Sequence, residues 1–307
     1  MLIRKFGSTG WDVSVMGLGT WNIGNQWGEM DDATAEAIVR AAYDGGMNLF
    51  DAAESYGEPQ GLSEMRLGRA LKGIRDNVYI VSKVGHWGAR TGQGIPKTTK
   101  DLIRGCGHAC AGRLRTDYID VLLCHDGGIE DPSIYIAGFE DLKDEGFIRA
   151  YGISPGGLDA LKRFHEMSGG KCAVAELDYS LLNRDPEQDL LPYCQENGIG
   201  VLVRGPVAMG LLSGTRSSTT SFSDPVRAGW NAGGPNRPEF EEKITRVEEI
   251  KAAIGGADLV TTALRYVISH PVNAVAIPGA TSTKQAAHNA AAGERALTAE
   301  ELAALPA

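Results

Sequence analysis

The sequence has no excess of basic residues and no long apolar run. Of its 307 residues, 39 are acidic and 30 are basic, so the formal net charge is −9. Lys and Arg do not cluster along the chain, and no nucleic-acid partner is expected. No run approaches the ~18 apolar residues of a membrane helix. The apolar segment within residues 1–11 is also too short for a signal peptide. We therefore expect neither a nucleic-acid partner nor a membrane partner.

Cysteine is scarce, and it is not arranged as a metal site would require. The five cysteines are an odd number and form no Cys-x-x-Cys pair, which favours a reducing cytoplasm as the location. Cys106 and Cys110 lie four residues apart on an expected helix, with His108 between them. A zinc site needs further ligands in the right geometry, so a partly buried helix face is the simpler interpretation. No metal is predicted.

Short apolar runs alternate along the chain with longer segments of helical periodicity. Near-continuous apolar strands are typical of a parallel sheet buried on both faces. Eight strand–helix units in a chain of this length favour a (β/α)₈ TIM barrel, formed by one domain over residues 1–307. An open doubly wound sheet is the second choice, but "GLGTWNIGN" leads into a loop rather than a helix. The expected strands are 13–19, 47–51, 78–84, 118–125, 149–154, 172–178, 198–204 and 273–279, and the expected helices are 32–45, 63–72, 99–114, 134–145, 158–168, 187–197, 242–268 with a break near 255–256, and 282–292.

Several local signals refine this arrangement. Residues 3–13 contain a Ser-Thr-Gly turn and are typical of a β-hairpin, which could close the bottom of the barrel. Residues 213–240 are rich in Ser, Thr, Gly, Pro and Asn and follow the seventh strand. A loop of that length in a compact domain is usually functional, and we expect it to order over a bound cofactor. The expected N-caps are Asp32, Ser63 and Ser282, and the expected helix-terminating glycines are Gly146 and Gly198.

Polar side chains stand at the carboxyl ends of the expected strands, where barrel enzymes place their chemistry. Asp51 ends the second strand and Tyr56 follows it, Lys83 ends the third, and His125 ends the fourth. Taken singly, each has a structural explanation, such as a cap or a solvated lysine. Together they indicate one pocket. A tyrosine with a reference pKa near ~10 needs a cation beside it to donate a proton at neutral pH, and a buried lysine needs an anion. Lys83 and Asp51 supply these, and His125 can orient the same substrate oxygen.

The chain resembles the aldo-keto reductase superfamily over essentially its whole length. The resemblance rests on "GLGTW", "NLFDAAESYG", "VSKVG", "DVLLCH", "GFIRAYGIS", "GPVAMGLLSG" and "IPGATSTKQAAHN". It implies a barrel that binds a nicotinamide cofactor, with a catalytic tetrad of Asp51, Tyr56, Lys83 and His125. Tyr56 would donate the proton in carbonyl reduction. The implied cofactor-binding residues are Gly19, Thr20, Trp21, Asp51, Ser154, Glu176, Arg204, Gly205, Pro206, Val207, Gly210, Leu211, Gly214, Pro278, Gly279, Ala280, Thr281, Gln285 and Asn289.

The sequence departs from the family pattern at several cofactor positions. Pro155 stands where Asn is common, and Glu176 stands where a Gln usually contacts the carboxamide. Arg204 replaces a frequent aromatic residue, and it could either face an anionic substrate group or pair with Glu176. Thr281 stands where many NADP-preferring members have Arg or Lys, although Lys284 is near. We expect NADP(H) to be preferred and NAD(H) to be possible.

Aromatic side chains in the expected loops indicate the substrate class. Tryptophans in such loops suit stacking on sugar rings or on flat aryl aldehydes. Asn22, Asn25, Gln26 and Glu29 add hydrogen-bonding capacity, which favours a polyhydroxylated carbonyl such as an aldose or ketosugar. The candidate substrate residues are Trp21, Trp27, Tyr56, His86, Trp87, His125, Asp126, Arg204 and Trp230.

Two other functions compete with a carbonyl reductase. A metal-dependent barrel hydrolase would need several His and Asp ligands at the strand ends, and only His125 clearly qualifies. A cofactor-sensing binding subunit could use the same scaffold without turnover. The intact set of Asp51, Tyr56, Lys83 and His125 favours the enzyme. The oligomeric state is left open.

Overall fold

The computed structural model describes residues 1–306, except for the side chain of Arg90. Its centre is an 8-stranded parallel sheet in the order β3 to β10. The sheet closes on itself, because Met16 bridges Ala276 and Gly19 bridges Gly279 in parallel. This is the predicted (β/α)₈ barrel. The strands are β3 (Leu18–Gly19), β4 (Leu49–Asp51), β5 (Tyr79–Val84), β6 (Ile119–Cys124), β7 (Ile148–Ile153), β8 (Val174–Asp178), β9 (Gly200–Arg204) and β10 (Val275–Ala276).

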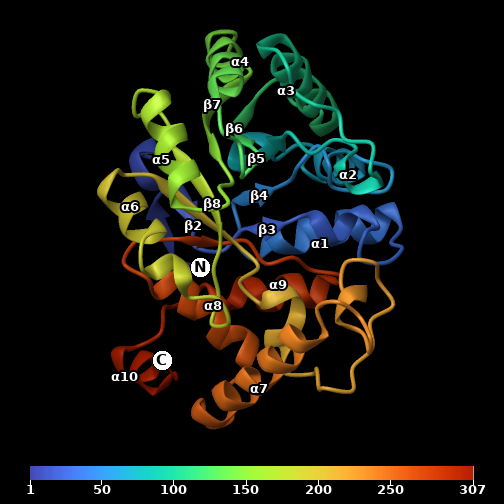
Figure 1. Cartoon of the computed structure of the whole chain (residues 1–307), viewed down its shortest axis with the longest axis vertical. Helices are drawn as coiled ribbons and strands as arrows, with labels where there is room; N and C mark the ends of the chain where they lie inside the picture. Colours follow the sequence, from blue (N-terminus) through green and yellow to red (C-terminus); the bar gives the residue numbers. More distant parts are fainter. Residues whose placement is uncertain (307) are drawn as a thin grey trace.

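Helices surround the strands on the outside (Figure 1). Apolar side chains between the helices and the sheet form one continuous core. Among the residues that the structure describes, no helix has the length and apolar character needed to cross a membrane. The helices are α1 (Asp32–Asp44), α2 (Leu62–Ala70), α3 (Lys100–Leu114), α4 (Ser133–Asp144), α5 (Leu158–Met167), α6 (Leu190–Glu196), α7 (Arg237–Ala253), α8 (Leu259–Ser269), α9 (Thr283–Ala292) and α10 (Ala299–Ala304).

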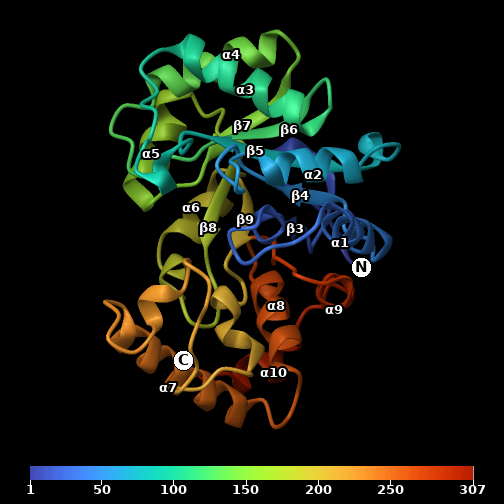
Figure 2. The same cartoon turned by 90° about the vertical axis from the view of Figure 1, so that its right-hand side faces the viewer.

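The predicted N-terminal hairpin is present and closes one end of the barrel. Strands β1 (Ile3–Lys5) and β2 (Asp12–Ser14) pair antiparallel. Between them, Phe6 joins a second apolar cluster inside the barrel. A Cβ atom on Gly200 would lie 2.9 Å from the Phe6 ring, so the base of β9 has room only for glycine. Figure 2 shows the N-terminus on the opposite side of the molecule from the segment that follows β9.

Some local predictions need correction. The predicted strand 13–19 is two strands, because β2 belongs to the hairpin and β3 to the barrel. Asp31, not Asp32, caps α1: its side chain accepts the Thr34 amide. Ser63 lies inside α2, where its hydroxyl bonds to Thr20 (2.7 Å). The structure confirms the Ser282 cap of α9, and it confirms Gly146 (φ 80°) and Gly198 (φ 64°) as left-handed residues after helices. The short helix α10 was not predicted.

The long segment after β9 has a small core of its own. It begins with the 3-10 helix η6 (Ala208–Ser213), contains η7 (Ala228–Trp230), and leads into α7. Phe222, Trp230 and Phe240 pack together, with ring centroids 5.7 Å apart in each pair. Trp230 is 4% exposed. The segment is therefore an ordered part of the barrel rim.

Candidate active site

Four polar groups surround the ammonium of Lys83, which lies fully buried on β5. Lys83 Nζ donates hydrogen bonds to Asp51 Oδ1, to the Ala52 carbonyl (2.9 Å) and to the Tyr56 hydroxyl (3.3 Å). Glu176 Oε2 lies 3.1 Å from the same nitrogen. Because parallel strands end at one rim, β4, β5 and β8 deliver these side chains to one point. The structure therefore brings together Asp51, Tyr56 and Lys83, and adds Glu176 to them.

This environment makes the groups hold their protons tightly. Burial raises the pKa of Tyr56, while the Lys83 charge opposes that rise. Burial also raises the pKa of Asp51 well above its usual range, the Glu176 charge adds to it, and Lys83 opposes it. Burial lowers the pKa of Lys83, but the Asp51 and Glu176 carboxylates outweigh that effect, and the net shift is upward. Lys83 is thus a cation, and it is positioned to stabilise negative charge on the Tyr56 oxygen.

Aromatic and imidazole rings pack around the Tyr56 side chain. His125 meets the Tyr56 ring edge-on with centroids 6.0 Å apart, and His86 stacks on His125 at 4.2 Å. Trp21 stacks on the Tyr56 ring with centroids 5.9 Å apart, and Trp27 stands edge-on to Trp21 at 5.0 Å. The structure therefore groups four of the predicted substrate residues around Tyr56.

The remaining predicted substrate residues lie less directly on this pocket. The guanidinium of Arg113 lies 5.0 Å from the ring centroid of Trp87. The Asp126 carboxylate accepts the Gly128 amide at 3.3 Å. Trp230 is buried within the segment after β9, where it packs against Phe222 and Phe240. The side-chain oxygen of Asn25 accepts from Arg66, and that of Gln26 accepts from Trp21 (2.6 Å) and from the Gly57 amide (3.0 Å). Both amide side chains thus have structural partners.

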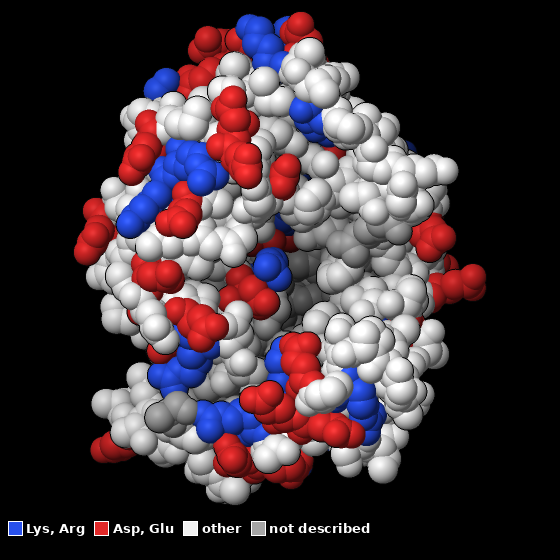
Figure 3. Space-filling model, viewed as in Figure 1, with Lys and Arg blue, Asp and Glu red and all other residues white. Residues whose placement is uncertain are grey.

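Arg204 does not pair with Glu176, one of the two alternatives drawn from the sequence. In the β8–β9 register, Arg204 lies opposite Asp178 and Glu176 lies opposite Leu202. Arg204 Nη1 consequently lies 3.6 Å from Asp178 Oδ2, and both side chains are about half exposed. Glu176 points to Lys83 instead, and the Ser154 hydroxyl donates to the Glu176 carbonyl at 3.1 Å. The charge of Arg204 is therefore held in a half-exposed ion pair. Figure 3 shows acidic and basic side chains around a hollow in this face of the molecule.

Glu54 organises the loop after β5, a role that the sequence pattern did not reveal. Its Oε1 atom accepts the amides of Gly85 (2.7 Å) and Trp87 (3.2 Å). Lys97, from the far end of the same loop, lies 3.6 Å from that oxygen. Glu54 thereby fixes the loop that carries His86.

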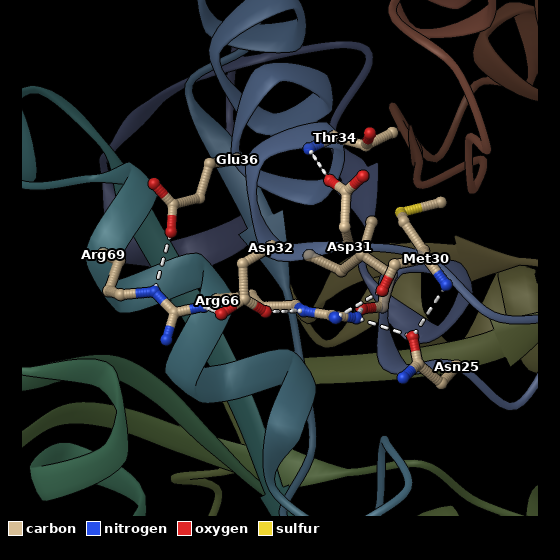
Figure 4. Close-up of polar contacts among 9 residues, drawn as sticks. Asn25, Met30, Asp31, Asp32, Thr34, Glu36, Arg66 and Arg69 are labelled. Carbon is tan, nitrogen blue, oxygen red and sulfur yellow. Dashed lines mark hydrogen bonds and ion pairs between the residues drawn. The ribbon is translucent and has the colours of Figure 1, made fainter.

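Arg66 of α2 is a second organising residue that sequence reasoning missed. Its guanidinium donates to the carbonyls of Ile23 (2.6 Å) and Met30 (2.6 Å), to Asn25 Oδ1 (2.8 Å) and to Asp32 (2.8 Å). Figure 4 shows it lying between α1 and the loop before it. That loop begins with the 3-10 helix η2 (Trp21–Gly24) and also carries Trp27. An Arg inside a helix gives no sequence signal of such a role.

The predicted phosphate-binding segment has an unusual backbone. Ala208 and Met209 have φ values of 48° and 50°, in the left-handed region, and Gly210 follows at 88°. Such conformations cost on the order of 1 kcal/mol each for residues with a Cβ, and they concentrate at functional sites. They lie in η6, which follows the segment Gly205–Pro206–Val207, contains Gly210 and Leu211, and is capped by Gly214.

The segment that follows β10 is the second one predicted to bind the cofactor. Gly19 lies beside Pro278 and Gly279, and the Thr20 hydroxyl donates to the Asp51 carbonyl at 2.7 Å. Ala280 is buried, and Thr281 donates from its amide (2.7 Å) and its hydroxyl (2.9 Å) to Gln285 Oε1. The side-chain amide of Asn289 donates a hydrogen bond to the Gly279 carbonyl at 3.2 Å. These residues thus form one ordered turn into α9.

No metal centre accompanies this cluster. Within residues 1–306, no group of three or more His, Cys, Asp or Glu side chains is arranged to hold a metal ion.

Comparison with known proteins identifies the family. The model of the aldo/keto reductase family matches residues 15–307. The chain belongs to the aldo/keto reductase family. It is thus an NAD(P)H-dependent oxidoreductase. Its relatives include an uncharacterised oxidoreductase, YqkF, of Bacillus subtilis, 32% identical over 98% of this chain and 94% of that protein. The methylglyoxal reductase YeaE of Escherichia coli is 32% identical over 96% and 91% of the two chains. The NADH-specific methylglyoxal reductase of the same species is 31% identical over 93% and 91%.

Solved aldo/keto reductases share the whole fold. The holo form of AKR11C1 from Bacillus halodurans has a TM-score of 0.81 and 31% identity, over 99% of this chain and 95% of that one. The glycerol dehydrogenase AKR11B4 from Gluconobacter oxydans has a TM-score of 0.83 and 28% identity, over 98% and 93%. An aldo-keto reductase from Klebsiella pneumoniae, solved in complex with NADPH, has a TM-score of 0.73 and 30% identity, over 99% and 94%.

Proposed function

We propose that this aldo/keto reductase interconverts a polar aldehyde or ketone and its alcohol, with Tyr56 as the proton donor. The observation that carries the proposal is the hydrogen bond from Lys83 Nζ to the Tyr56 hydroxyl, with Asp51 on the same ammonium. A phenol is a weak acid, and burial weakens it further here. A cation in contact with its oxygen is what allows it to release a proton during the reaction.

Each residue of the tetrad has a distinct part in this proposal. A nicotinamide cofactor, when bound, supplies or accepts the hydride at the substrate carbon. Tyr56 gives its proton to the carbonyl oxygen, and the tyrosinate that remains is stabilised by Lys83. Asp51 holds Lys83 in place. His125, edge-on to Tyr56, would donate to the same substrate oxygen and so fix its direction.

The chain's own residues fit a nicotinamide dinucleotide. Neither carboxylate oxygen of Glu176 has a hydrogen-bond partner in the described part of the chain, and Glu176 is 1% exposed. An amide group placed there would give it a donor. The strained backbone at Ala208 and Met209 and the turn into α9 suit phosphate groups, because backbone amides and a helix N-terminus favour anions. We assign the carboxamide end to Ser154 and Glu176, and the adenosine end to Thr281, Gln285 and Asn289.

We propose NADP(H) as the preferred cofactor, with NAD(H) as a possible one. Thr281 offers no positive charge to a 2′-phosphate, but Lys284 stands in the first turn of α9. The relatives use both cofactors: the Klebsiella pneumoniae enzyme was solved with NADPH, and one Escherichia coli relative is NADH-specific. The segment from residue 213 to 240 would order further over the bound cofactor.

The substrate class that we propose is a small polar carbonyl compound, including sugars. Trp21 and Trp27 offer apolar faces beside Tyr56, and Arg204 places a positive charge at the rim. Two relatives are methylglyoxal reductases, and a structural relative is a glycerol dehydrogenase. A cytoplasmic location would suit the enzyme, since all five cysteines are free.

A carbonyl panel with both cofactors tests this function. We expect NADPH oxidation with methylglyoxal, glyceraldehyde or an aldose, and tight NADPH binding by tryptophan fluorescence. The competing function, a cofactor-sensing subunit, predicts tight binding without turnover on any compound. Binding of neither cofactor would contradict both functions.

A further inference from the structure

Lys83 is surrounded by more oxygen atoms than it has hydrogens to give. An ammonium carries three N–H groups. Those of Lys83 are committed to Asp51 Oδ1, the Ala52 carbonyl and the Tyr56 hydroxyl. Glu176 Oε2 is a fourth oxygen at 3.1 Å, near enough for charge attraction but without a hydrogen to accept. Glu176 is therefore a second carboxylate beside a lysine whose three N–H groups are already donated to other oxygen atoms.

An ionised Glu176 would be poorly supported in this position. The residue is 1% exposed, and both its carboxylate oxygens lack a hydrogen-bond partner among the described residues. Removing a carboxylate from water without a hydrogen-bond donor is costly. Asp51, 2% exposed, is a second carboxylate in contact with the same ammonium, so a proton could be shared between the two carboxyl groups.

Charge counting leads to the same conclusion. With Lys83 positive and both carboxylates ionised, the buried cluster would carry a net charge of minus one. With one proton shared between the carboxylates it is neutral. Buried carboxylates that crowd one site characteristically hold a single proton between them. The titratable groups that face Glu176 are Lys83, Asp51 and Tyr56, and Lys83 is the only cation among them.

We propose that Asp51 and Glu176 share one proton in the resting enzyme, and that Glu176 thereby controls how readily Tyr56 donates its own. The control of Tyr56 by Glu176 rests on the proposed reductase function, whereas the shared proton does not. In agreement with a shared proton, burial and the Glu176 charge raise the pKa of Asp51. The shared proton would bridge the two carboxyl groups and leave one Glu176 oxygen free to accept from a cofactor amide.

Loss of the shared proton would slow carbonyl reduction. While the shared proton is present, Tyr56 faces a neutral cluster that contains a cation. When the shared proton is lost at higher pH, the cluster becomes negative. Its negative charge then destabilises the tyrosinate that carbonyl reduction creates. A unit charge a few ångströms away in a protein interior changes such a step by roughly ten- to hundredfold. We therefore expect kcat for reduction to fall by about that factor as the shared proton is lost.

Infrared spectroscopy of the ligand-free full chain tests the shared proton directly. We expect the C=O stretch of a buried carboxylic acid near neutral pH, sensitive to deuterium exchange, which disappears on raising the pH. Glu176→Gln and Asp51→Asn should each abolish it, because each leaves the other carboxylate ionised beside Lys83. Asp178→Asn, on the same strand but half exposed, is the matched control and should keep the band.

A band that survives in Asp51→Asn would overturn sharing, since Glu176 would then be protonated by burial alone. Absence of any such band in the wild type would also overturn it, and that result needs no variant to fold.

The pH profile of kcat provides the second readout. In the wild type, reduction should fall on an alkaline limb that coincides with loss of the infrared band. In Glu176→Gln, that limb should move to higher pH. An alkaline limb at the same pH as in the wild type would overturn the proposed control of Tyr56 by Glu176. If no carbonyl compound is reduced while the band behaves as described, the proposed function fails and the shared proton stands.

Discussion

The ammonium of Lys83 donates a hydrogen bond to the Tyr56 hydroxyl at 3.3 Å and lies 4.9 Å from the centroid of the Tyr56 ring. Both side chains are buried, so water screens this interaction only weakly. The contact couples the acidity of the tyrosine to the charge of the lysine, and through it to Asp51 and Glu176.

Replacing the lysine should affect both activity and folding. Lys83→Met leaves two buried carboxylates without their cation, and removing one partner of a buried pair costs about 3 kcal/mol or more of unfolding free energy. We expect kcat to drop by at least about a hundredfold, since a positioned acid is worth that much. Thermal melts and steady-state kinetics measure the two effects. Lys100→Met is the control: Lys100 is exposed on α3 and pairs with Asp141, and its loss should change little. Equal effects of the two variants would contradict the account.

Much of this arrangement could be predicted from sequence, because it follows from short-range patterns. Apolar runs such as 78–84 and polar residues at their ends placed Asp51, Tyr56, Lys83 and His125 on one rim. Strand spacing could not predict which charges pair. Arg204 pairs with Asp178 because they are register partners, and register depends on how the whole barrel closes. Ser63 resembled an N-cap, yet tertiary packing places it inside α2.

Arg66 could not be found from sequence for the same reason, and it provides a second prediction. Arg66→Lys keeps the charge but loses most of the bonds to Ile23, Asn25 and Met30. We expect a loss of about 2–4 kcal/mol in unfolding free energy, from several charge-assisted bonds, and a raised KM with a smaller change in kcat. Arg69→Lys is the control, since Arg69 pairs with Asp32 and Glu36 on the helix surface. A normal KM in Arg66→Lys would show that the loop with Trp21 does not depend on it.

Arg227 links the long segment after β9 to the Trp27 loop. Its guanidinium lies 5.1 Å from the centroid of Trp27 and 4.6 Å from that of Phe222, and it pairs with Asp224 at 2.7 Å. We expect NADPH to slow proteolysis between residues 213 and 240 in the wild type, and Arg227→Met to reduce that protection severalfold. Arg216→Met is a matched control, because Arg216 also stacks on Phe222, at 5.6 Å. Equal cleavage with and without NADPH would contradict an ordering role for the segment.

The C-terminal helix α10 should give the fold a measurable acid sensitivity. Arg295 and the Thr298 amide hold the pKa of Glu301 at about 2, below its value of about 4.3 in an unfolded chain. A lowered carboxyl pKa stabilises the folded state above the unfolded pKa, and this contribution is lost as the pH falls through the folded pKa. Glu301→Gln should therefore lower the melting temperature at pH ~6 and make little difference near pH ~2. Melts that differ equally at both pH values would contradict this linkage.

Tyr56→Phe is the decisive test of Tyr56 as the proton donor, because it removes one oxygen and keeps the ring that contacts Trp21 and His125. We would measure NADPH binding by fluorescence and turnover of the best carbonyl substrate for the wild type and the variant. We expect unchanged NADPH binding and a loss of kcat of at least about a hundredfold. Turnover close to that of the wild type, with the cofactor bound, would contradict Tyr56 as the proton donor.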